Sequence, residues 1–75
     1  MPTLRDFGSF QIRMYFKDHN PPHVHVVCPD KTVLLGIVDG TVIRGKIGAA
    51  MLRTARAWVA EHNQELLAKW KEFQK

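Results

Sequence analysis

The sequence is poor in cysteine and has no long apolar run, and each absence excludes a class of protein. Cys28 is the only cysteine among 75 residues, so no disulfide can form within the chain. This usage suits a reducing compartment. The longest apolar run, residues 33–38, is far too short to cross a bilayer. Since the N-terminus also lacks the basic and then apolar order of a signal peptide, we expect a cytoplasmic protein without a membrane partner.

The chain also lacks a basic tail, although it is basic as a whole. Its net charge is +4, divided equally between residues 1–47 and residues 48–75. This balance favours anionic partners such as nucleic acid, an acidic protein or anionic lipid. The short length allows only one domain, residues 1–75, which buries roughly 60% of the surface of its unfolded chain. Because so small a core is marginal, we expect the chain to work with a partner, and a homo-oligomer is one such assembly.

Residues 10–44 show the alternation of β-strands. The segments predicted as strands are residues 10–17, 23–28, 32–38 and 41–44. In the first of them, one face is apolar and carries Phe10, Ile12, Met14 and Phe16. Asp39-Gly40 is typical of a two-residue hairpin turn between the last two strands. Residues 1–9 have no steady period and are expected to form an arm or an irregular segment.

From Ala49 the apolar residues recur at helical spacing. One helix over residues 49–74 would span roughly 40 Å, which is long for so small a domain. We therefore predict a break at His62-Asn63, where Asn63 can cap a second helix. The predicted fold is α+β: an antiparallel β-meander of three to four strands, followed by two C-terminal helices packed on its apolar face.

The most informative stretch is Asp18-His19-Asn20-Pro21-Pro22-His23-Val24-His25-Val26. Two adjacent prolines make a stiff turn, and strand alternation then directs His23 and His25 to the same face. A hairpin that keeps the apolar faces of the first two strands together gathers five side chains on the opposite surface: Arg13, Tyr15, Lys17, His23 and His25. One register that does so sets Lys17 opposite His23 and Tyr15 opposite His25.

Two interpretations assign chemistry to this surface. In the first, His23 and His25 act as base and acid in phosphodiester chemistry on RNA. Arg13 or Lys17 would then stabilise the developing negative charge. In the second, the two histidines bind a divalent metal ion, and the sequence indicates no other cofactor. The third metal ligand would be Asp18 or His19.

Two further interpretations involve no chemistry. The surface can be a recognition face for a protein or a nucleic acid, or it can be simply a polar sheet face without a function. The other residues of reactive or aromatic type are expected to have structural roles and not to belong to the site. Cys28 alternates with the histidines and is expected in the core, and His62 is expected at a helix interface. Trp58 and Trp70 lie at core spacing.

Three stretches together resemble a family of short bacterial proteins that is known only as a domain of unknown function. They are Arg13-Met14-Tyr15, the Asp18 to Val26 stretch, and Glu61 to Trp70. The Asp-His-Asn-Pro-Pro-His-x-His signature is specific, whereas the helical stretch alone is not. The family often enters its first helix through Leu-Pro, where this chain has Ile47-Gly48. The resemblance implies these site positions: Arg13, Tyr15, Asp18, His19, Asn20, Pro21, Pro22, His23 and His25.

The resemblance also implies a toxin–antitoxin-type pair in which the partner is a small protein encoded beside this one. We therefore predict a cytoplasmic component of such a pair that acts on RNA or another anionic partner, with the question of catalysis left open. The alternatives are a protein–protein interaction module and a divalent-metal-binding domain. The candidate catalytic residues are His23 and His25. The candidate binding residues are Arg13, Tyr15, Lys17, Asp18, His19 and Asn20.

Overall fold

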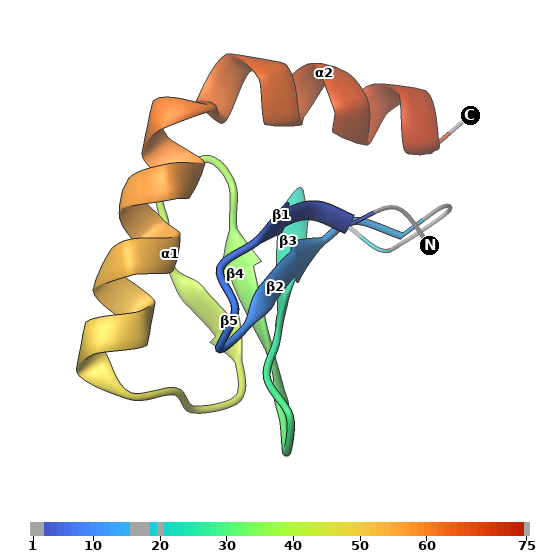
Figure 1. Cartoon of the computed structure of the whole chain (residues 1–75). Coiled ribbons are helices and arrows are strands. Elements are labelled where there is room, and N and C mark those ends of the chain that lie inside the picture. The colour runs from blue at the N-terminus through green and yellow to red at the C-terminus, as the bar shows by residue number, and fades with distance from the viewer. Residues whose placement is uncertain (1–2, 16–18, 20, 75) are drawn as a thin grey trace.

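The structure, a computed structural model, describes residues 3–15, 19 and 21–74. A five-stranded antiparallel sheet is followed by two helices (Figure 1), which confirms the α+β class. The strands lie in sequence order across the sheet: β1 (Thr3–Asp6), β2 (Gln11–Arg13), β3 (His23–Val27), β4 (Thr32–Gly36) and β5 (Val42–Arg44). The helices are α1 (Ala49–Glu61) and α2 (Asn63–Phe73).

The extra strand, β1, corrects the expectation that residues 1–9 form an irregular arm and that the sheet has at most four strands. Its pairing with β2 passes from Thr3 opposite Arg13 to Arg5 opposite Ile12. Leu4 is therefore an additional residue, a β-bulge. Because a bulge interrupts the alternation of faces, the period-two pattern that identifies the other strands is absent here.

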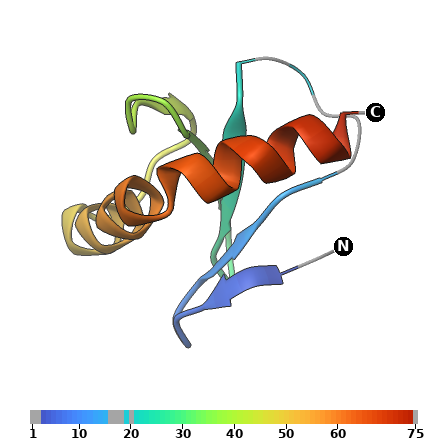
Figure 2. The same ribbon diagram turned by 90° about the horizontal axis from the view of Figure 1, so that it is seen from above.

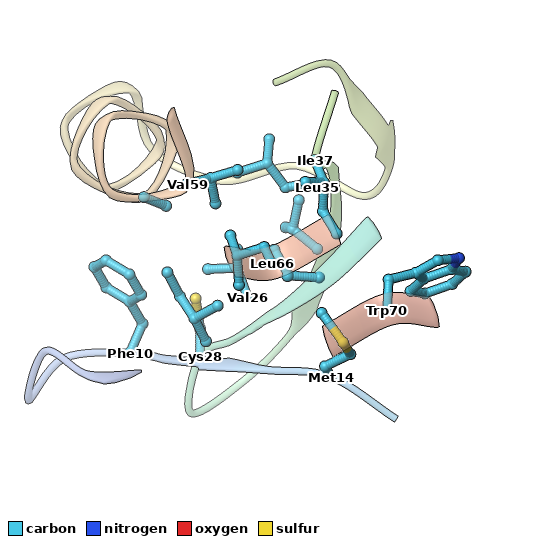
Figure 3. Packing of buried hydrophobic residues seen from close by; sticks show 13 residues of the cluster. Phe10, Met14, Val26, Cys28, Leu35, Ile37, Val59, Leu66 and Trp70 are labelled. Atoms are coloured by element: carbon cyan, nitrogen blue, oxygen red, sulfur yellow. The ribbon is translucent and has the colours of Figure 1, made fainter. Parts of the chain in front are cut away.

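The core lies on one face of the sheet, as predicted. Ile12 in β2 and Met14 directly after β2 are fully buried there, and Cys28 is only 7% exposed. The helices supply the other side of the core with Ala55 and Val59 from α1 and Leu66 and Trp70 from α2. Figure 3 shows Trp70 at one end of this cluster and Phe10 toward the other. Phe16, the last residue of the predicted apolar face, lies outside the described residues.

The helices are separate, and the break falls where the sequence predicts it. The residue between them is His62, and α1 and α2 run in different directions from this junction (Figure 1, Figure 2). The predicted cap is wrong, because Asn63 makes no cap hydrogen bond. Its Nδ2 atom instead donates to the Ile37 carbonyl oxygen at 2.5 Å and so ties the junction to the end of β4. In the part of the chain that the structure describes, no helix is long and apolar enough to span a membrane.

The loop between β4 and β5 is wider than the predicted two-residue turn. The Gly36 N–H donates to the Thr41 carbonyl at 2.8 Å, which leaves residues 37–40 in the loop. The reason is a local competitor: the Asp39 Oδ1 atom accepts a hydrogen bond from the Thr41 N–H at 3.0 Å. The fourth loop residue, Gly40, has a positive φ of 71° and accepts a hydrogen bond from Arg56 Nε at 2.9 Å. The loop is thereby attached to α1.

Asp39 gives this loop a pH dependence. The hydrogen bond from the Thr41 backbone, followed by one from the Thr41 side chain, lowers the pKa of Asp39 below its ordinary value. A group with a lowered pKa stabilises the fold above its unfolded-state pKa, and this contribution is lost as the pH falls through the folded-state pKa. We therefore expect Asp39→Asn to reduce the loss of stability between neutral pH and about pH 3, measured by urea unfolding. Asp30→Asn, in another exposed turn, is the charge-matched control, and an equal effect of both changes would contradict the prediction.

Candidate functional site

The candidate site is the sheet face opposite the core, called here the open face. Paired residues on neighbouring antiparallel strands project to the same side. Arg13 lies opposite His25, and Gln11 lies opposite Val27. These four side chains are half-buried, whereas the core residues between them along the strands are almost completely buried. The structure thus brings Arg13 and His25 onto one surface, as the hairpin argument predicts.

The particular register that places Tyr15 opposite His25 is wrong. Arg13 takes that place instead, so the hairpin is shifted by two residues. A two-residue shift leaves every side chain on its own face, and the alternation pattern therefore cannot distinguish the two registers. The other half of that register, Lys17 opposite His23, involves a residue outside the described part of the chain.

Four aromatic rings form a continuous series from the open face into the core. The Tyr15 and His25 rings meet edge to face, with centroids 4.3 Å apart. The His23 ring lies 5.1 Å from the His25 ring, and it also lies 5.1 Å from the Trp70 ring of α2. His23 is only 3% exposed, whereas His25 is half-buried. The two histidines are therefore adjacent but differ in access: His25 is at the surface and His23 is interior.

The two prolines hold His23 in this interior position. The His23 Nδ1 atom is 2.8 Å from the Pro21 carbonyl oxygen and donates to it. The Pro22 carbonyl accepts a second hydrogen bond from the Ile37 N–H at 3.0 Å. Prolines have no N–H to donate, but their carbonyls remain acceptors. The turn is thus anchored to both β3 and the end of β4.

Arg13 is oriented by Gln11, which strand alternation places on the same face, and through Gln11 by Asp6, which the sequence pattern does not reveal. Its Nε and Nη2 atoms donate to Gln11 Oε1 at 3.0 and 2.6 Å. Gln11 Nε2 in turn donates to Asp6 Oδ2 at 3.3 Å. Asp6 belongs to β1, the strand that the alternation pattern misses. If β1 is recognised as a strand paired with β2, Asp6 comes to lie beside Gln11. The hydrogen-bonded relay from Asp6 through Gln11 to Arg13 could then be predicted.

A second arginine, Arg44, also belongs to the open face. It lies opposite Leu34, which lies opposite His25. The successive pairs form a row across four strands, called here the cross-strand row: Arg13, His25, Leu34 and Arg44. Sequence reasoning misses Arg44 because its face depends on an irregularity in β5. Only the pairing with β4 identifies it.

The remaining predicted site residues are His19 and three residues that the structure does not describe. His19 is exposed, and Lys17, Asp18 and Asn20 lie outside the described residues. Among residues 3–15, 19 and 21–74, no group of three His, Cys, Asp or Glu side chains could hold a metal ion. The metal set of His23, His25 and Asp18 therefore stays a prediction.

His62 has a structural environment, as predicted. Its ring stacks on Trp58 with centroids 4.4 Å apart, and its Nδ1 atom donates to the Trp58 carbonyl at 2.9 Å. Both contacts hold the junction residue His62 against the last turn of α1.

The fold and its open face define a small α+β protein with a surface of arginine, tyrosine and histidine side chains on one side of an antiparallel sheet. A family model described as a domain of unknown function (DUF4160) matches residues 9–71, and the chain belongs to this family. The match covers strands β2 to β5, the Asp18 to Val26 stretch, all of α1 and most of α2, and β1 precedes it. Searches of curated proteins and of solved structures found no match.

Proposed function

We propose that this chain binds RNA through its open face, as the small cytoplasmic component of a toxin–antitoxin-like pair. The observation that carries the proposal is the position of Arg13 directly opposite His25, with the Tyr15 ring against the same imidazole. A guanidinium suits a phosphate, and aromatic rings offer stacking surfaces to bases. The net charge of +4 supports an anionic partner.

The relay from Asp6 through Gln11 supports the same proposal. It fixes the direction of the Arg13 side chain before any ligand arrives. An arginine that is already ordered loses less conformational freedom when it binds a phosphate. An acidic protein, such as the partner encoded beside this chain, is the alternative ligand for the face.

The proposal is tested by measuring RNA binding at several salt concentrations. Arg13→Ala should weaken binding and should lower the slope of log K against log salt by about 0.7, the value for one lost phosphate contact on a single strand. Arg53→Ala removes the same charge from an exposed position on α1 and is the matched control. Equal effects of the two changes would show that only overall charge matters, and this would contradict the site.

Expression in cells tests the toxin–antitoxin setting. The chain is expressed alone, together with its encoded neighbour, and as His25→Ala, while growth and total RNA are followed. Growth arrest that the neighbour relieves and His25→Ala abolishes would support a toxin. Unchanged growth, combined with no RNA on the purified protein, would overturn the RNA proposal.

A further inference from the structure

Charged residues are few in four of the five strands, whereas β1 carries Arg5 and Asp6. In β2–β5, all of whose residues are described, Arg13 and Arg44 are the only charged side chains. They come from strands that are not neighbours, yet both belong to the cross-strand row. Between them lie His25 and Leu34, and both of these side chains are half-buried. The face therefore has a cation near each end of a row whose middle is a ring and an aliphatic side chain.

A β-bulge in β5 is responsible for the position of Arg44. The pairing passes from Leu35 opposite Val42 to Leu34 opposite Arg44, so Ile43 is the additional residue. Without the bulge, Ile43 would lie opposite Leu34. Arg44 would then lie one position further along and would point to the core side of the sheet. Bulges commonly redirect a side chain in this way near binding sites. Gly45 follows immediately with a positive φ of 91°, and a Cβ atom there would lie 3.0 Å from the Thr32 carbonyl oxygen.

We infer that the cross-strand row is the track of a single-stranded RNA, which crosses the strands with one phosphate at Arg13 and another at Arg44. This inference rests on the proposed function and names its ligand. Three strand-to-strand steps separate the arginines by about 14 Å, a distance that a few nucleotides of extended backbone can bridge. The bases between these phosphates lie over His25 and Leu34, with the Tyr15 ring beside them.

The composition of the row favours a single strand over a duplex. In a duplex the base faces are stacked within the helix and cannot reach a ring on a protein surface. Duplex recognition relies instead on many contacts to phosphates and 2′-hydroxyls, and β2–β5 offer only two cations. Open sheet faces that bind single strands combine a few cations with aromatic rings, as this one does.

The test uses the full chain and two fluorescent probes, an oligouridine of about ten nucleotides and an RNA duplex of the same length. Binding is followed by anisotropy over a range of salt. Arg44→Ala should weaken oligouridine binding about two- to fivefold, the effect of one exposed charge contact. The salt slope should fall by about 0.7 for Arg44→Ala and by about 1.4 for Arg13→Ala/Arg44→Ala. Arg53→Ala is again the control. Arg44→Gln also removes the charge but keeps a longer side chain than alanine. Circular dichroism confirms that each variant is folded.

The outcomes separate this inference from the function on which it rests. If Arg13→Ala weakens binding and Arg44→Ala behaves like Arg53→Ala, RNA binding stands and the track along the row is overturned. Equal or tighter binding of the duplex would overturn the single-stranded ligand. If the unchanged protein binds neither probe, both this inference and the proposed function fail.

Discussion

Trp70→Ala should lower the free energy of unfolding by about 3–5 kcal/mol, the usual cost of removing a buried tryptophan. Trp70 is 4% exposed, and its ring contacts the His23 ring as well as the apolar core. A chain of 75 residues has a total stability of roughly 4–11 kcal/mol. The substitution should therefore remove much of the stability and lower Tm by more than about 12 °C. Thermal and urea unfolding followed by circular dichroism measure both quantities.

Two control substitutions test whether burial of the Trp70 ring causes the loss of stability. Trp58→Ala removes the same side chain from a half-buried position on α1 and should cost clearly less. Trp70→Phe retains a ring in the core and should recover part of the loss. A cost for Trp70→Ala below that for Trp58→Ala would contradict the position of α2 against the sheet.

If the open face cleaves RNA, His25→Ala should lower the cleavage rate about 10²–10⁴-fold while RNA binding persists. His25 is the accessible imidazole of the pair, and it lies opposite the cation that would stabilise the developing charge. The pH–rate profile of the unchanged protein should be bell-shaped if an acid and a base both take part. Single-turnover cleavage of a labelled RNA, with binding measured in parallel, separates the two effects.

His23→Ala is the informative comparison. Since His23 is buried and its ring donates a hydrogen bond to the Pro21 carbonyl oxygen, this change should lower the free energy of unfolding by about 1–3 kcal/mol. A rate loss for His23→Ala equal to that of His25→Ala, in protein shown to be folded, would mean that both imidazoles take part directly. If neither substitution changes a rate, or if no cleavage occurs, the face is a binding surface only.

Much of the fold follows from local pattern. The alternation around Ile12 identifies the face that the helices cover, and the change of period at Ala49 locates the first helix. The missing parts depend on irregular pairing. The bulge at Leu4 conceals β1, and the Asp39 side chain replaces a two-residue turn by a wider loop. Such features depend on particular atoms and leave no periodic signal.

The candidate site follows the same division. Strand parity is sufficient to bring Arg13, Tyr15 and His25 together. It cannot give the burial of His23, because the covering ring, Trp70, comes from the far end of the chain. Nor can it find Arg44, whose face is reversed by one unpaired residue. Strand parity thus predicts which surface carries the site. Contacts between distant segments and irregular strand pairing decide which of its side chains are exposed and which further residues join them.

The cross-strand row also limits how the gene can change. Its members are far apart in the sequence, and their common face depends on the count of residues within each strand. A codon gained or lost in a surface loop leaves that count unchanged and is tolerated more readily. Loss of the single codon between Val24 and Val26 would remove His25 and reverse the remainder of β3, so that Val26 would face the open side and Val27 the core. Related genes that retain the surface should therefore vary in length in their loops, and insertions within strands should appear as bulges.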